Sequence, residues 1–226
     1  MNFLIKSGQG LKGEITIPGD KSISHRSIIL SSLAEGTSKI YGLLEGADCL
    51  ATIEVFRNMG IKIVNEEGVY SIEGNGLRGL EAPQKPLDFG NSGTSIRLCS
   101  GILSAQNFQS TLVGDSSLSS RPMQRIVEPL TGMGAKITSN NGTLPLNISP
   151  TDSLHSIDYL LPVASAQVKS CVMLAALYAE GVTKIEEGSV TRDHTENMFK
   201  QFGIPLNIEN SDSKKSISLG NVNSIN

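Results

Sequence analysis

The stretch FRNMGIKI (residues 56–63) decides how this chain is organised, because it recurs as LTGMGAKI (130–137) and as FKQFGIPL (199–206). In each copy an apolar helical run ends at a glycine, the residue that best adopts the left-handed conformation at a helix end. A short apolar strand follows each glycine. The glycine returns after 74 residues and again after 69 residues. Such self-similarity indicates one structural unit present three times.

Each unit has the same order of predicted helices and strands around that glycine. A short strand comes first (EITI, PLDF or IDYL), then an apolar helix, a second strand, an amphipathic helix and a closing hairpin. The first helices are apolar nearly all round, which predicts that they are buried. We therefore expect an α/β (α+β) fold of three β-α-β-α-β-β repeats in a single domain over residues 1–226. The repeats cover about residues 14–79, 86–150 and 157–220.

Composition excludes several classes of function. The chain has 226 residues, a formal net charge of −3, a pI near 5.7 and only 4% aromatic residues, which argues against a nucleic-acid partner. It contains neither a leader-like segment nor an apolar run that could cross a membrane, so we expect a cytoplasmic location. Cys49, Cys99 and Cys171 lie in apolar stretches and are expected to be buried thiols. The sequence has no Cys/His cluster, and neither a metal nor a cofactor is expected.

Polar and cationic residues gather where helices are predicted to begin. Cations are unfavourable at a helix N-terminus, which carries partial positive charge, unless an anion binds there. If the three units pack as repeats, the starts of their first helices lie at the same end of the fold and form an anion site. Lysine and arginine together suit a ligand with more than one negative charge. The residues concerned are Lys21, Ser22 and Arg26 in unit one, Asn91, Gly93 and Arg121 in unit two, and Ser165, Gln167 and Arg192 in unit three.

Plainer interpretations compete with this one. Lys21 and Arg26 could be solvated surface residues, and Arg121 could form a structural ion pair. GNSG (90–93) could be a connecting turn, and Ser165 and Gln167 could be simple helix caps. His25 and His194 are expected to be surface or capping residues rather than general bases. Adjacent motifs do not assemble a Ser/His/Asp set, and GNSGTS lacks the Gly-Lys-Ser/Thr ending of a Walker loop.

Six motifs, in this order along the chain, resemble those of one enzyme family, the 5-enolpyruvylshikimate-3-phosphate (EPSP) synthases. The residues of the motifs are most similar to those of its bacterial class II members. The resemblance implies the enolpyruvyl transferase fold, in which three units form each of two half-barrels around a cleft. This chain is similar to the N-terminal half-barrel, and the C-terminal domain is expected to be absent. The motifs are PGDKSISHRS (18–27), LLEGADCLATIEVFRNMG (43–60), LDFGNSGTSIRL (87–98), GDSSLSSRPM (114–123), PVASAQVKS (162–170) and TRDHTE (191–196).

The resemblance also implies substrates and roles. The family transfers the enolpyruvyl group of phosphoenolpyruvate to the 5-hydroxyl of shikimate-3-phosphate. Gly93 is glycine where glyphosate-tolerant class II members have alanine, which implies a glyphosate-sensitive full-length enzyme. Shikimate-3-phosphate would contact Lys21, Ser22, Arg26, Ser165, Gln167 and Arg192. Phosphoenolpyruvate would contact Lys21, Asn91, Gly93 and Arg121.

The family's acid and base residues lie in the second domain, so the resemblance places no catalytic residue in this chain. We expect the chain alone to bind shikimate-3-phosphate weakly and to be inactive without the C-terminal half. A non-catalytic anion-binding domain that needs a complementary chain is the alternative. A more remote alternative is UDP-N-acetylglucosamine enolpyruvyl transferase, which has Lys-Asn where this chain has Lys21-Ser22.

Overall fold

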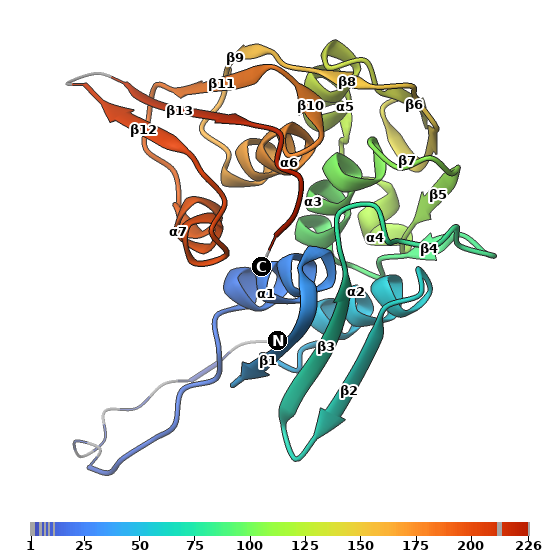
Figure 1. The fold of residues 1–226 in the computed structure, drawn as a ribbon. Coiled ribbons are helices and arrows are strands. Elements are labelled where there is room, and N and C mark those ends of the chain that lie inside the picture. The colour runs from blue at the N-terminus through green and yellow to red at the C-terminus, as the bar shows by residue number, and fades with distance from the viewer. Residues whose placement is uncertain are drawn as a thin grey trace.

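The computed structural model describes residues 3–4, 6, 8, 10, 12–211 and 214–225. Helices and strands alternate in three successive groups, as the repeat predicts (Figure 1). The recurring glycines Gly60, Gly134 and Gly203 all have left-handed φ angles, of 85°, 96° and 69°. The expectation that a helix ends at each of them is therefore confirmed.

The first unit contains a three-stranded antiparallel sheet in the order β1-β3-β2. Two helices accompany it, and the β2–β3 hairpin closes the unit, as predicted. The elements are α1 (Lys21–Leu33), β1 (Glu35–Tyr41), α2 (Ala47–Arg57), β2 (Lys62–Glu66) and β3 (Val69–Asn75).

The second unit has a four-stranded sheet in the order β4-β5-β7-β6, in which β4 is parallel to β5 and the other pairs are antiparallel. A short helix, α4, precedes the amphipathic helix α5 and was not predicted. The elements are β4 (Leu87–Asp88), α3 (Gly93–Leu103), β5 (Ser110–Val113), α4 (Ser116–Ser119), α5 (Gln124–Gly132), β6 (Lys136–Asn140) and β7 (Thr143–Ser149).

The third unit repeats this arrangement in the order β12-β13-β11-β9, with β9 parallel to β11. A small parallel pair, β8 with β10, is added beside it. The elements are β8 (Leu154–His155), β9 (Asp158–Leu160), α6 (Ala166–Ala176), β10 (Ala179–Glu180), β11 (Val182–Glu187), α7 (His194–Gln201), β12 (Asn207–Asn210) and β13 (Lys215–Gly220).

One predicted strand is absent from the described part of the chain. Residues 14–17 (EITI) form no strand, and Ile15 and Ile17 are 81% and 72% exposed. The counterparts β4 and β9 pair in parallel with the strand after the next helix. The chain before α1 does pass close to the end of β1, because a Cβ on Gly19 would lie 2.1 Å from the carbonyl oxygen of Gly42. Before Gly19 it leaves the sheet, so alternating apolar residues alone do not make a strand there (Figure 1).

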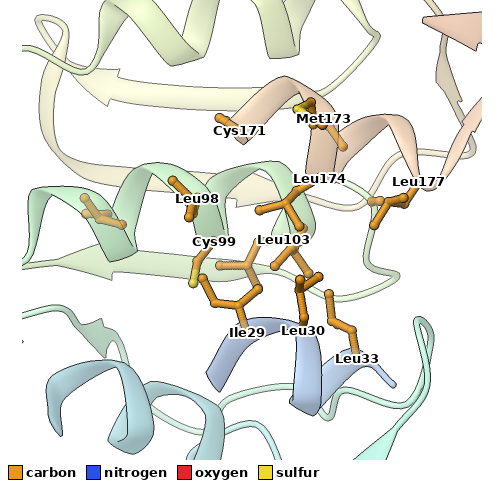
Figure 2. Packing of buried hydrophobic residues seen from close by; sticks show 14 of the residues in the cluster. Ile29, Leu30, Leu33, Leu98, Cys99, Leu103, Cys171, Met173, Leu174 and Leu177 are labelled. Atoms are coloured by element: carbon orange, nitrogen blue, oxygen red, sulfur yellow. The ribbon is translucent and has the colours of Figure 1, made fainter. Parts of the chain in front are cut away.

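The core lies between the first helices of the three units, with the sheets outside them (Figures 1 and 2). Helices α1, α3 and α6 are buried on most sides, as their apolar sequences predict. Helices α3 and α6 approach so closely that a Cβ on Gly101 would lie 2.3 Å from the carbonyl oxygen of Cys171. This packing fixes the helix starts of different units relative to one another. Figure 2 shows the contributing side chains Ile29, Leu30, Leu33, Leu98, Cys99, Leu103, Cys171, Met173, Leu174 and Leu177.

Candidate functional site

Each of the three central helices begins with a short polar side chain that caps it. Asp20 accepts a hydrogen bond of 2.8 Å from the backbone N–H of Ile23 at the start of α1. Ser92 caps α3 by accepting from the N–H of Ser95 at 3.2 Å, and Ser165 caps α6 in the same manner. Such caps satisfy one N–H group in the first turn of a helix and leave others available to a ligand.

The starts of these helices meet at one pocket of about 460 Å³. The start of α7 contributes to the same pocket, so all three units line it. The expectation that the helix starts converge is confirmed. Six of the nine predicted site residues line the pocket: Lys21, Ser22, Arg26, Ser165, Gln167 and Arg192. The other lining residues are Asp20, Thr94, Ala164, Ala166 and His194, which were not predicted as site residues.

Arg26 is buried at the back of this pocket, with only 4% of its surface exposed. Its guanidinium donates from Nε to Thr195 Oγ1 at 2.7 Å, from Nη2 to Ser170 Oγ at 2.7 Å and from Nη1 to the Ser22 carbonyl oxygen at 3.0 Å. Burial lowers the pKa of Arg26 to about 10, although the negative charge of Glu196 opposes this shift. Arg26 thus stays a cation at neutral pH. It links α1 to α6 and α7 and is not a solvated surface residue.

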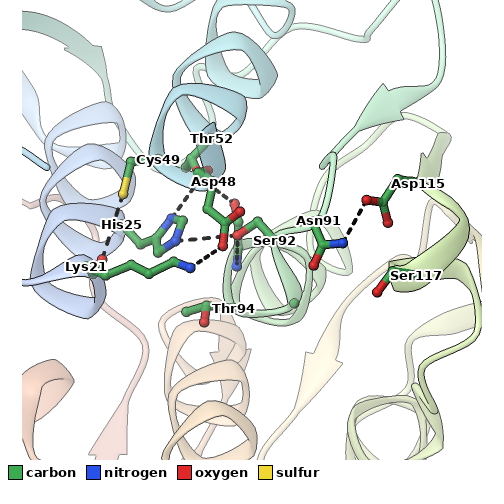
Figure 3. A network of polar contacts seen from close by, with 12 residues as sticks. Lys21, His25, Asp48, Cys49, Thr52, Asn91, Ser92, Thr94, Asp115 and Ser117 are labelled. Carbon is green, nitrogen blue, oxygen red and sulfur yellow. Dashed lines mark hydrogen bonds and ion pairs between the residues drawn. The ribbon is translucent and has the colours of Figure 1, made fainter. Parts of the chain in front are cut away.

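Two more cations lie nearer the solvent. Arg192, which precedes α7, donates from Nη1 to Ser22 Oγ at 3.2 Å. Lys21 forms an ion pair with Asp48 in the first turn of α2, and half of its side chain is exposed (Figure 3). The pocket therefore combines a buried guanidinium with two accessible cations, an arrangement suited to a ligand that carries several negative charges.

Asn91 and Arg121, predicted for the same site, do not line this pocket but contact each other. The guanidinium of Arg121 donates from Nη2 to Asn91 Oδ1 and from Nη1 to the Asn91 carbonyl oxygen, the latter at 3.4 Å. Asn91 Nδ2 donates to Asp115 Oδ2 at 2.7 Å (Figure 3). Arg121 therefore belongs to a polar loop beside the pocket, and its side chain is still partly exposed.

Gly93 connects this loop to the pocket through Arg97, a residue that was not predicted. Arg97 Nη1 donates to the Gly93 carbonyl oxygen at 2.9 Å and to Gln167 Oε1 at 3.2 Å. Gln167 Nε2 in turn donates to Thr94 Oγ1 at 3.0 Å. Burial lowers the pKa of Arg97, and the neighbouring charge of Arg121 lowers it further. An arginine one helical turn after the predicted loop glycine was the signal that could have revealed it.

His25 differs from the expectation that it lies on the surface or caps a helix. It is completely buried between α1, α2 and α3 (Figure 3). Its Nδ1 lies 2.8 Å from Thr52 Oγ1, and its Nε2 lies 3.4 Å from Ser92 Oγ. Burial lowers the pKa of His25 to about 4. A neutral imidazole in this position joins the first two units, and it cannot reach a ligand in the pocket as a base.

Two other expectations concern thiols and metals. Cys49, Cys99 and Cys171 are buried and free, as predicted. Burial raises the pKa of Cys49 to about 11 and that of Cys99 to about 12, so these thiols stay protonated.

Among the residues that the structure describes, no three His, Cys, Asp or Glu side chains are grouped so that they could hold a metal ion. In the same part of the chain, none of the helices has the length and apolarity that a bilayer crossing requires.

Both the sequence and the fold of this chain match those of known proteins. A family model described as EPSP synthase (3-phosphoshikimate 1-carboxyvinyltransferase) matches residues 5–222. The chain is 58% identical over 206 residues to the 3-phosphoshikimate 1-carboxyvinyltransferase of Ruthia magnifica subsp. Calyptogena magnifica, covering 91% of this chain and 47% of that protein. It is 53% identical over 214 residues to the enzyme of the same name from Hydrogenovibrio crunogenus, covering 94% and 48%.

A solved structure is similar as well. The EPSP synthase of Acinetobacter baumannii matches with a TM-score of 0.88 and 50% identity, over 94% of this chain and 48% of that one. The chain spans about half the length of the curated relatives it matches. The family match covers nearly every residue of the chain, and the fold agrees with it. The chain therefore belongs to the EPSP synthase family.

Proposed function

We propose that residues 1–226 form the N-terminal domain of a cytoplasmic enzyme that transfers the enolpyruvyl group of phosphoenolpyruvate to the 5-hydroxyl of shikimate-3-phosphate. The domain comprises the units 14–79, 86–150 and 157–220, and a C-terminal half of the same enzyme completes the cleft. One observation carries this proposal: all three units meet at a single pocket that combines a buried guanidinium with accessible cations.

Each substrate takes one part of the site. Shikimate-3-phosphate binds in the pocket, where the cations Lys21, Arg26 and Arg192 face its phosphate and carboxylate while hydroxyl and amide groups hold the ring. Phosphoenolpyruvate binds against the neighbouring loop of Asn91 and Gly93 and is clamped by Arg121. The hydrogen bonds of Arg97 to Gly93 and to Gln167 support the idea that the two subsites are adjacent. The remaining contacts in the pocket are assigned to Ser22, Ser165 and Gln167.

The reaction is an addition followed by an elimination. The 5-hydroxyl oxygen attacks C2 of phosphoenolpyruvate and loses its proton to a base, while the methylene carbon gains a proton from an acid. The tetrahedral intermediate then loses a proton from its methyl group as the C2–O bond to phosphate breaks, and inorganic phosphate leaves. Fixed cations favour the charge that develops on the departing phosphate.

We infer that the acid and the base come from the C-terminal half, because the family resemblance places them there. Asp20 lines the pocket, but its hydrogen bond from the backbone of Ile23 lowers its pKa, so it is a poor acid at neutral pH. One of its carboxylate oxygens also caps α1, and the lowered pKa makes the carboxylate a weak base as well. We therefore expect the chain alone to bind substrate without turnover.

The alternative function is that of a non-catalytic anion-binding domain. The same cations would serve it equally well, and only turnover after addition of the second half separates the two. The more remote alternative, a UDP-N-acetylglucosamine enolpyruvyl transferase, predicts that the UDP-sugar and not shikimate-3-phosphate binds the pocket.

Titration of the purified chain with shikimate-3-phosphate, followed by amide chemical shifts, tests the proposal. We expect shifts around Lys21, Ser165 and Arg192 with a dissociation constant near the millimolar range. Arg192→Ala should weaken binding about tenfold, corresponding to ~1.4 kcal/mol, whereas Arg57→Ala, at a surface ion pair with Glu54, should not change it. Turnover should appear only when the separately produced C-terminal half of a relative is added. Unchanged spectra at millimolar ligand would refute the assignment of the pocket.

A further inference from the structure

Four charged side chains of the third unit are buried together, and none of them lines the pocket. They come from α6 (Lys169), β11 (Glu187), α7 (Glu196) and β13 (Lys215), and each is at most 8% exposed. Lys169 Nζ lies 2.6 Å from Glu196 Oε1 and 3.2 Å from Glu187 Oε1. Lys215 Nζ lies 3.0 Å from Glu196 Oε1 and 3.6 Å from Glu187 Oε1. We call these four residues the charge quartet. Its two lysines and two glutamates together carry no net charge.

Global stability is a weak reason for such an arrangement. Removing four charges from water costs free energy that their mutual attraction only partly returns, and apolar side chains of similar size are often at least as stable. One carboxylate oxygen, Glu196 Oε2, even lacks a hydrogen-bond partner among the described residues. Buried ion pairs can instead fix which elements meet and in what register.

The quartet fixes the segment that leads into α7. Glu187 Oε2 accepts from Thr191 Oγ1 at 2.7 Å and from the Thr191 backbone N–H at 3.3 Å. Thr191 immediately precedes Arg192. The capping residue of α7, Asp193, makes no side-chain cap hydrogen bond. Glu187 therefore restrains the backbone from which Arg192 reaches Ser22.

The quartet also adjoins, along the chain, the groups that hold Arg26. Thr195, which accepts the Arg26 Nε–H, is the neighbour of Glu196 on α7. Lys169 lies beside Ser170, which accepts the Arg26 Nη2–H. Two of the three groups that hold Arg26 are thus next in sequence to members of the quartet.

We propose that Lys169, Glu187, Glu196 and Lys215 form a positioning network for the anion pocket, setting Arg192 through Thr191 and Arg26 through Thr195 and Ser170. These are positioning residues, because they act through the two arginines and do not line the pocket. The inference rests on the proposed function, since it concerns the affinity of the same pocket.

A charge-neutral double variant, Lys169→Met with Glu196→Met, tests the network. We expect the urea midpoint of the double variant to be equal to or higher than that of the wild type, and the dissociation constant for shikimate-3-phosphate to rise at least tenfold. The exposed pair Lys62–Glu73 in unit one offers the matched control, Lys62→Met with Glu73→Met, which should leave the affinity unchanged. Wild-type affinity in the folded K169M/E196M chain would overturn the proposal.

Thr191 provides a second test that leaves the buried charges in place. Thr191→Val removes the hydroxyl that donates a hydrogen bond to Glu187, and it should raise the dissociation constant for shikimate-3-phosphate at least threefold. Thr191→Ser keeps the hydroxyl and should restore wild-type binding. Equal affinity of T191V and T191S would overturn the proposal even if K169M/E196M fails to fold.

Hydrogen exchange at the side chain of Arg26 separates this inference from the proposed function. If the wild type fails to bind shikimate-3-phosphate, the proposed function fails, but the Arg26 Nε–H should still exchange slowly because Thr195 holds it. It should exchange at least tenfold faster in K169M/E196M, whereas T191V, which acts on Arg192, should leave its exchange rate unchanged. An exchange rate in K169M/E196M equal to that of the wild type would overturn the network.

Discussion

At the scale of single residues, Arg26 explains how cations are kept at helix starts. The side chain is buried, and its hydrogen bonds reach α1, α6 and α7. A buried cation held only by neutral oxygens keeps most of its positive charge available to a nearby anion. An anionic ligand would therefore stabilise the arrangement that local electrostatics disfavours.

Gly93 gives the first residue-scale prediction. A Cβ there would lie 2.8 Å from Arg97 Nη1 and 3.0 Å from Arg121 Nη1, both at the ends of flexible side chains. Gly93→Ala should therefore change the free energy of unfolding by less than about 1 kcal/mol and displace the two guanidinium groups. We expect phosphoenolpyruvate to bind the two-half enzyme several-fold more weakly. Shikimate-3-phosphate should be weakened less, because it is affected only through the contact of Arg97 with Gln167. Isothermal titration with each substrate checks this, and equal weakening of both would contradict it.

His25 gives a pH-dependent prediction. The unfolded chain binds a proton at this imidazole below about pH 6.5, whereas the folded chain does so only below about pH 4. Burial is the main cause, Asp48 opposes it, and Lys21 and Arg26 add to it. Folding stability should therefore fall as the pH drops from 6.5 to 4, by at most about 3.5 kcal/mol, because about 2.5 pKa units at ~1.4 kcal/mol each are involved.

Urea unfolding at several pH values measures this effect. The His25→Asn variant cannot titrate there, so its stability should depend less on pH between 6.5 and 4 than that of the wild type. Any overall loss of stability from the substitution does not matter, because the slopes are compared. Identical slopes would show that His25 is not the group responsible.

At the scale of elements, the contact between α3 and α6 is the tightest test of the packing. A methyl group on Gly101 would meet the Cys171 carbonyl oxygen at 2.3 Å, and backbone atoms cannot move aside as side chains can. Gly101→Ala should destabilise the fold by about 1–3 kcal/mol. Gly132→Ala is the matched control, because nothing lies within 4 Å of its added Cβ at the end of α5.

Thermal and urea unfolding compare the two alanine variants. We expect Gly132→Ala to be neutral or slightly stabilising, since alanine favours a helix by up to ~1 kcal/mol. If Gly101→Ala were equally harmless, the close approach of the two helices would be wrong.

The repeat made most elements predictable from sequence, because apolar spacing and the recurring glycine both report local conformation. The apolar helices and the hairpins formed as expected. Residues 14–17 did not, since pairing depends on where the chain leads and not on alternation alone. The burial of His25 and the bridge made by Arg97 were also missed. Both depend on side chains from other units, which local spacing does not reveal.

At the scale of the whole molecule, the main sheets of the first and third units differ in one respect. Strand β11 is paired on both sides, by β13 and by β9. Strand β1 is paired with β3 on one side, and among the described residues only its first N–H is paired on the other, from Glu35 to the Ile225 carbonyl oxygen at 2.8 Å. Since that N–H points away from β3, the antiparallel alternation directs the N–H groups of Thr37, Lys39 and Tyr41 to the same open edge.

This edge gives the last prediction, which hydrogen exchange tests within a single strand. The amides of Ser38 and Ile40 face β3 and should be protected, whereas those of Thr37, Lys39 and Tyr41 should exchange at least a hundredfold faster in the chain alone. An open sheet edge readily accepts a further strand. If the C-terminal half completes the cleft as proposed, its addition should slow exchange at these three amides and leave Ser38 and Ile40 unchanged. Protection of all five amides before the second half is added would contradict the open edge, and fast exchange at the three afterwards would mean that the halves join elsewhere.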